Sequence, residues 1–191
     1  TSLGVTVLLI AIAIGMAFRD GRVPPSSTTD GNAGRQVESI SNENGDTAAE
    51  PGNRTVPETF AFLVGVRSYR FADGALDLEY TESDVDELSR LLLKRGVPRR
   101  NIQLLTQWSE ADNPQLAPTA SNIRRRLKSM LSGCIEGDNV IVAITGMGGE
   151  SGRAGVYCYM PAGARLDRVE SLITLNEFFT LFENCKRIHW E

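Results

Sequence analysis

The sequence is poor in the residues that most often catalyse reactions or bind metals. Among its 191 residues there is one histidine, His189, and there are three cysteines, Cys134, Cys158 and Cys185. The cysteines lie far apart and lack metal-ligand spacing, and their odd number argues against a disulfide framework. We therefore expect neither a bound metal nor a cofactor.

An excess of positive charge is also missing. Lysine and arginine number 20 against 24 acidic residues, which gives a net charge of −4 and no indication of nucleic-acid binding. Arginines 124–126 form the basic cluster of the chain, and a solvated helix face explains them better than a phosphate site does. Apolar residues make up 41% of the chain, enough for the core of one globular domain.

Charged residues are absent from residues 1–18, where leucine, isoleucine and valine dominate. The stretch is close to the ~20 apolar residues that a membrane-spanning helix needs, and Arg19 and Arg22 follow it. We expect a single-pass membrane anchor over residues 1–20, with the side of the membrane left open. The apolar core of a secretory signal is the alternative interpretation.

Large apolar residues are scarce over residues 21–57, which are rich in serine, threonine, asparagine, glycine, glutamate and proline. Such a segment buries too little apolar surface to offset the entropy lost on ordering. We therefore expect a disordered linker at 21–57 and a folded domain over 58–191.

Hydrophobic patterning in the domain alternates between strand and helix. Apolar runs predict strands, and a period of 3.6 residues predicts helices. The predicted strands cover 60–66, 101–105, 140–144 and 156–160, and the predicted helices start near Thr81 or Ser83, Thr119 or Ser121, and Thr174. This order predicts an α/β fold with a mainly parallel sheet and helices on both faces.

Glycines follow the strongest predicted strand, 140–144, at Gly146, Gly148 and Gly149. They predict a tight turn at the carboxyl end of the strand, where ligands and catalytic groups collect in open α/β sheets. A dinucleotide-binding turn is disfavoured, because Ser151 replaces the last glycine and a strand rather than a helix comes next. A flavodoxin-like ligand-binding module remains an alternative.

Six short motifs occur in a distinctive order, at residues 61–69, 78–88, 101–106, 118–123, 144–148 and 173–177. Their order and spacing resemble the caspase-like peptidases, the group that includes metacaspases and their bacterial relatives. The resemblance implies a three-layer caspase-like α/β fold, incomplete at the C-terminus of this chain. It also implies peptide or protein substrates.

A Cys–His dyad is the mechanism that the resemblance implies. The histidine handles the proton of a cysteine thiolate that attacks the peptide carbonyl. The backbone N–H of the glycine after the histidine, here Gly148, is a candidate oxyanion donor. Asp84 matches the acid that selects arginine or lysine before the cleaved bond. An ordinary acidic residue in the first turn of a helix is the alternative interpretation of Asp84.

The sequence departs from the family pattern at Met147, which stands at the histidine position. A thioether neither takes nor gives a proton at neutral pH. His189 lies in a further predicted strand that starts at 187–190, and it is expected to be structural. None of the three cysteines matches the nucleophile position, which we expect beyond Glu191. We therefore expect a pseudo-peptidase that binds peptides or partner proteins. An active endopeptidase that cleaves after arginine or lysine is the alternative.

Overall fold

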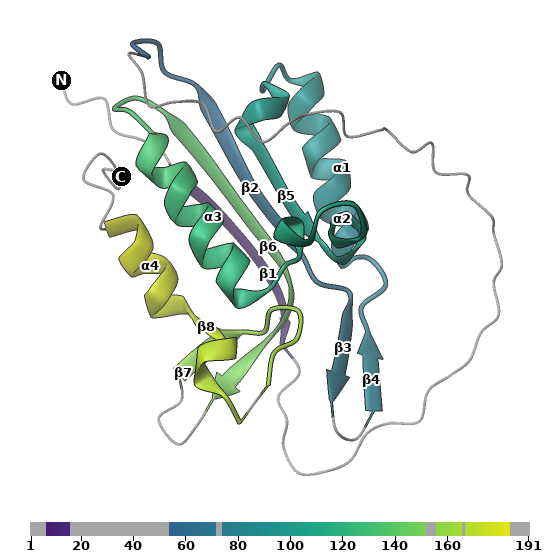
Figure 1. Ribbon diagram of the computed structural model, residues 1–191. Helices are drawn as coiled ribbons and strands as arrows, with labels where there is room; N and C mark the ends of the chain where they lie inside the picture. Colours follow the sequence, from purple (N-terminus) through teal and green to yellow (C-terminus); the bar gives the residue numbers. More distant parts are fainter. Residues whose placement is uncertain (1–6, 16–53, 72–73, 152–155, 166, 184–191) are drawn as a thin grey trace, which may run out of the picture.

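A computed structural model of the chain describes residues 7–15, 54–71, 74–151, 156–165 and 167–183. Its main sheet has six strands in the order β5-β2-β6-β7-β8, with β1 also paired to β6 (Figure 1). The strands are β1 (Val7–Gly15), β2 (Thr59–Gly65), β5 (Ile102–Thr106), β6 (Asn139–Ser151), β7 (Val156–Tyr159) and β8 (Ile173–Thr174). β1, β2, β5 and β6 run parallel, whereas β7 and β8 are antiparallel additions.

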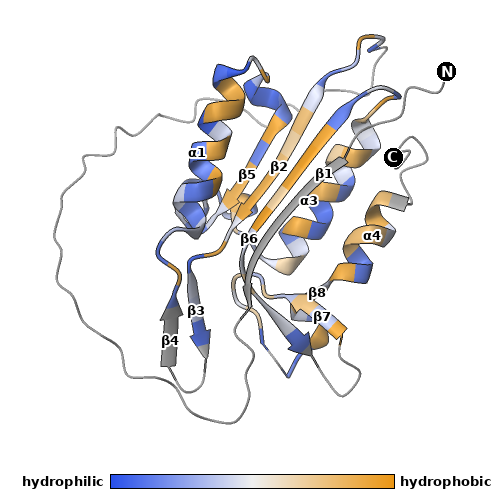
Figure 2. Ribbon diagram, turned by 180° about the vertical axis from the view of Figure 1, so that it is seen from behind, coloured by the Kyte–Doolittle hydropathy of each residue, from blue (hydrophilic) through white to orange (hydrophobic). Residues whose placement is uncertain are grey.

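Helices cover both faces of this sheet (Figures 1 and 2). The helices are α1 (Thr81–Lys94), α2 (Gln107–Asp112), α3 (Ala120–Gly133) and α4 (Leu175–Glu183). Phe62 and Val64 of β2 belong to the apolar cluster that includes α3 and α4, whereas Ala61 and Leu63 belong to the cluster that includes α1. Successive side chains of a strand point to opposite faces, and β2 therefore carries apolar side chains on both of its faces. The predicted three-layer, mainly parallel α/β fold is confirmed.

Two elements form where the sequence predicted loops. β3 (Ser68–Phe71) pairs with β4 (Gly74–Asp77) as a separate hairpin. The short helix α2 follows β5 directly, and the hydroxyl of Thr106 caps it by accepting the N–H of Ser109 at 3.0 Å. Both elements depend on local hydrogen bonding rather than on a long apolar pattern, which explains why periodicity did not indicate them.

The predicted turn at Gly146–Gly148 is wrong, because β6 continues through these glycines to Ser151. Beyond Met147 the strand finds a new partner, since Gly148 lies opposite Tyr159 and Ser151 opposite Val156 on β7. Gly146 has φ +150°, which side-chain-bearing residues rarely adopt. The glycines therefore allow β6 to pass a crowded point rather than to reverse.

The helix predicted over residues 1–20 is also not what the structure has. Val7–Gly15 forms strand β1, parallel to β6, with Val7 opposite Val140 and Gly15 opposite Gly148. The β-branched residues of this stretch, Val7, Ile10, Ile12 and Ile14, favour strands. Among the described helices, none combines the length and apolar character that crossing a membrane requires. The membrane location stays a prediction.

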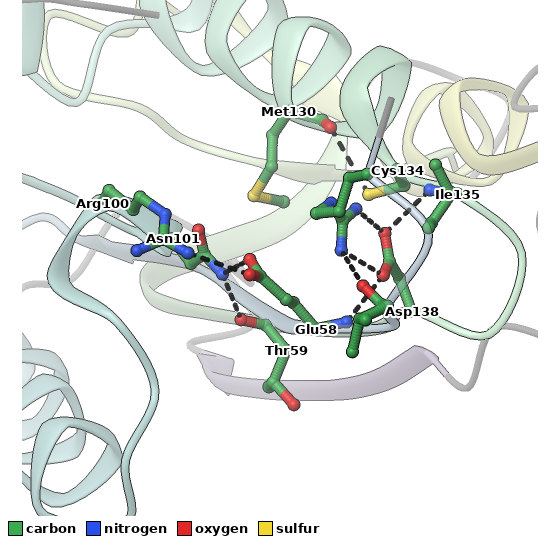
Figure 3. A network of polar contacts seen from close by, with 10 residues as sticks. Glu58, Thr59, Arg100, Asn101, Met130, Cys134, Ile135 and Asp138 are labelled. Carbon is green, nitrogen blue, oxygen red and sulfur yellow. Dashed lines mark hydrogen bonds and ion pairs between the residues drawn. The ribbon is translucent and has the colours of Figure 1, made fainter. Parts of the chain in front are cut away.

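Asp138 anchors the start of the domain through a buried carboxylate (Figure 3). It accepts two hydrogen bonds from the guanidinium of Arg54, one from the N–H of Glu58 at 2.8 Å and one from that of Ile135 at 2.7 Å. Burial alone would raise the pKa of Asp138, but these donors hold it below its ordinary value. Arg54, expected to lie in the linker, is thus bonded to the domain.

Candidate functional site

Met147 lies on β6 with its side chain 3% exposed. It belongs to the apolar cluster that also holds Tyr69, Cys158, Tyr159 and Met160. Its backbone is equally enclosed, because its N–H donates to the Tyr69 hydroxyl at 2.8 Å and its carbonyl accepts the N–H of Met160 at 2.9 Å. The position that the sequence resemblance assigns to the proton carrier is therefore filled by an apolar, packed side chain.

Two tyrosines close around this part of β6. The hydroxyl of Tyr69 donates to the carbonyl of Met160 at 3.0 Å, and that of Tyr159 donates to the carbonyl of Thr145 at 3.1 Å. Burial raises the pKa of both phenols, so both stay neutral donors at physiological pH. A Cβ atom on Gly146 would lie 2.5 Å from the Tyr69 oxygen, so glycine is needed there.

The other two residues singled out from the sequence lie in different settings. Gly148 lies in β6 between Tyr159 of β7 and Gly15 of β1. Asp84 lies in the first turn of α1, exposed to solvent, where its N–H donates to the carbonyl of Tyr80 at 2.9 Å. The oxyanion role of Gly148 and the substrate-binding role of Asp84 stay predictions.

The described cysteines are placed as packing residues. Cys134 is fully buried just after α3, and its Sγ donates to the carbonyl of Met130 at 3.4 Å. Cys158 lies on β7 and is 4% exposed. Cys134 lies before the start of β6, whereas Met147 lies toward the other end of that strand. Cys185 and His189 lie outside the described residues.

A pocket of about 500 Å³ that the sequence analysis missed opens where β2 and β5 end. Its lining residues are Arg67, Ser68, Tyr69, Arg70, Asp77, Glu82, Gln107, Trp108, Gly163, Ala164 and Arg165. Cavities at the carboxyl ends of parallel strands are the usual ligand sites of open α/β sheets. Nothing in the spacing of these residues along the chain indicated that they meet, because they come from four separate segments.

Glu82 is the buried acid of this pocket, with 1% of its surface exposed. Its Oε1 accepts the N–H groups of Gln107 and Trp108, the latter at 3.2 Å, and so caps helix α2. Burial raises the pKa of Glu82, and the two N–H groups offset part of that effect. The sequence feature that could have indicated Glu82 is its position two residues before Asp84, in the same turn of α1.

Gln107, which is bonded to Glu82, also binds the start of the hairpin that lines the pocket. Its Oε1 accepts the N–H groups of Arg67 at 3.0 Å and Ser68 at 2.7 Å, and its Nε2 donates to the carbonyl of Ser68 at 3.1 Å. These bonds join the start of β3 to α2. The walls are thus held by three hydrogen bonds from one amide, which gives the pocket a defined shape.

Comparison with known proteins supports one family. The family model described as the caspase domain matches residues 58–188, more than half of the chain. The match spans the described elements from β2 to α4. A search of curated proteins finds no match.

Proposed function

The chain belongs to the caspase-domain family, and on this premise we propose that it is a pseudo-peptidase that binds peptides or partner proteins. The family resemblance implies a histidine at position 147, and a thioether stands there. Catalytic groups of this kind act as a unit, so the loss of one member lowers the rate by orders of magnitude. The wild-type domain is therefore expected to bind without cleaving.

The observation that carries this proposal is the packing of Met147. Its side chain is buried in an apolar cluster, and its N–H is held by Tyr69. If methionine had replaced histidine at an open site, an unfilled polar cleft would be left around the methionine. Here the neighbours complement the apolar side chain, which supports an adapted rather than an accidental loss.

The pocket beside Glu82 supports the binding half of the proposal. It has the size range of ligand sites, and it combines buried polar groups with the aromatic side chains of Tyr69 and Trp108. Trp108 is 50% exposed, so its ring is available to a ligand. A scaffold without a proton carrier can keep such a recognition site.

The test uses the full-length protein in two assays. In the first, fluorogenic peptides with arginine or lysine before the cleaved bond are incubated with the wild type and with Met147→Ala; we expect no hydrolysis by either. If the wild type hydrolyses the peptides and Met147→Ala hydrolyses them equally well, the pseudo-peptidase assignment is overturned and an active endopeptidase is favoured. In the second assay, a peptide array is probed with the protein; absence of binding to any peptide would overturn the binding role.

A further inference from the structure

Three buried side-chain polar atoms among the described residues have no hydrogen-bond partner: Nε of Arg67, Oε2 of Glu82 and Oε1 of Gln103. Arg67 and Glu82 line the same pocket. A buried polar atom without a partner is unfavourable, and most such atoms in native proteins are paired. One unpaired donor and one unpaired acceptor at one cavity therefore point to a ligand that pairs both.

The charges of these two groups restrict the ligand. A carboxylate would accept from Arg67 but would face the carboxylate of Glu82. An ammonium would donate to Glu82 but would face the guanidinium of Arg67. A primary carboxamide has a carbonyl acceptor and an NH₂ donor on one carbon and no net charge, so it complements both groups without repulsion.

We propose that the pocket binds the carboxamide of an asparagine or glutamine side chain in a bound peptide. The carbonyl accepts from Nε of Arg67, and the NH₂ donates to Oε2 of Glu82. This assignment rests on the proposed peptide-binding function and names the side chain that the peptide presents. It does not involve Met147 or a cleavage step.

The rest of the pocket suits a neutral side chain with an aliphatic stem. The rings of Tyr69 and Trp108 and the methyl group of Ala164 offer apolar walls. One rim cation is already paired within the protein, because Arg165 forms an ion pair with Asp167 at 2.9 Å, and the Asp77 carboxylate is bound by the Ser68 hydroxyl at 2.6 Å. The rim thus adds limited attraction for a charged ligand.

The two carboxylate oxygens of Glu82 differ in their hydrogen bonding, so one substitution can change Oε2 and keep the bonds of Oε1. Oε1 is occupied by the N–H groups of Gln107 and Trp108, so only Oε2 is left for a ligand. In Glu82→Gln the amide oxygen keeps the helix cap, and the NH₂ group takes the place of Oε2. The pocket then presents two donors, which complement a carboxylate rather than a carboxamide.

The experiment measures fluorescence anisotropy with the full chain and peptide pairs that differ only in glutamine against glutamate, or asparagine against aspartate. We expect the wild type to bind the amide peptide at least about tenfold more tightly than its acid partner. Glu82→Gln should reverse this preference. Glu87→Gln, the same exchange at an exposed acid of α1 outside the pocket, is the matched control and should leave the preference unchanged.

Each outcome decides the assignment. Peptide binding that does not distinguish amide from acid would overturn the carboxamide assignment and leave the proposed function standing. A preference that survives Glu82→Gln, or that Glu87→Gln reverses, would also overturn it. Failure to bind any peptide would overturn both. If Glu82→Gln does not fold, the wild-type preference together with its loss in Arg67→Met decides the question.

Discussion

The phenol oxygen of Tyr69 lies 2.8 Å from the backbone nitrogen of Met147 and 3.0 Å from the carbonyl oxygen of Met160. One hydroxyl thus accepts from β6 and donates to the residue that follows β7. Tyr69 itself belongs to the β3–β4 hairpin, which is separate from the main sheet. The side chain of Tyr69 therefore joins the hairpin to the strand that carries Met147.

Tyr69→Phe removes both hydrogen bonds while keeping the ring. It leaves the N–H of Met147 and the carbonyl of Met160 buried without this partner, so we expect a loss of about 1–3 kcal/mol in the free energy of unfolding. Urea denaturation measures the change. Tyr157→Phe is the control, because Tyr157 is 58% exposed and should lose little. Equal effects of the two substitutions would contradict the role assigned to the Tyr69 hydroxyl.

Gly146→Ala should destabilise the domain for two reasons that can be separated. The residue has φ +150°, and its new Cβ would approach the Tyr69 oxygen to 2.5 Å. In the Tyr69→Phe background the second cause is gone, so the same substitution should cost less than it does in the wild type. A double-mutant cycle measured by urea denaturation tests this. Strict additivity would show that the close approach contributes nothing.

Much of the fold could be predicted because apolar periodicity is a local signal. The strand at 140–144 and the helix from Thr119 occur as expected, and the Thr119 hydroxyl caps α3 by accepting the N–H of Asn122 at 3.3 Å. The helix predicted to start near Thr81 or Ser83 is α1, which begins without a side-chain cap because Thr81 has a tertiary partner. Its hydroxyl donates to the carbonyl of Val66 at 2.9 Å, and so it ties α1 to the end of β2 instead.

The helix predicted to start near Thr174 shows the same limit. The Thr174 hydroxyl caps α4 by accepting the N–H of Glu177 at 3.0 Å. The carboxylate of Glu177, however, is bonded to Arg124, which also donates to the carbonyls of Glu170 and Leu172. Arg124, expected on a solvated face, joins α3 to the segment around α4. Long-range pairing of this kind leaves no trace in local spacing.

The site was only partly predictable for a related reason. Met147 could be singled out because the resemblance assigns its position in one short motif. The pocket of Glu82 could not, since it depends on the meeting of α1, α2, the β3–β4 hairpin and the loop at 163–165. The family resemblance indicated Asp84, the exposed acid of that turn, and not Glu82, the buried one.

Arg54→Ala should destabilise the domain by about 1–3 kcal/mol at pH 7, because it removes two charge-assisted hydrogen bonds to the buried Asp138. The pKa of Asp138 is lowered on folding, so its contribution is present above the unfolded pKa of about 3.9 and is lost as the pH falls through the folded pKa. The difference between wild type and Arg54→Ala should therefore shrink below pH 4. Unfolding free energies at pH 7 and pH 3 measure it.

Arg165→Ala is the matched control for that substitution. Arg165 pairs with Asp167 at 2.9 Å, but both side chains are more than half exposed, at 57% and 66%. Surface pairs of this kind contribute little, so we expect no measurable change at either pH. A pH-independent loss in Arg54→Ala would contradict the role assigned to the Asp138 carboxylate and would indicate lost packing of Arg54 on the ring of Phe60 instead.

Met147→His introduces the histidine that the family resemblance implies at this position. The site is 3% exposed and apolar, so an imidazole there would be buried and its pKa would fall below the ordinary value of about 6.5. A buried neutral imidazole binds fewer protons than the unfolded chain does, so the variant should lose stability as the pH falls through 6.5. Met147→Leu, which keeps the site apolar, should show no such dependence. Denaturation at pH 8 and pH 5.5 compares them. If the stability of Met147→His does not depend on pH and the variant cleaves peptides, the imidazole reaches solvent and substrate. The residues packed around Met147 would then have rearranged to admit the histidine.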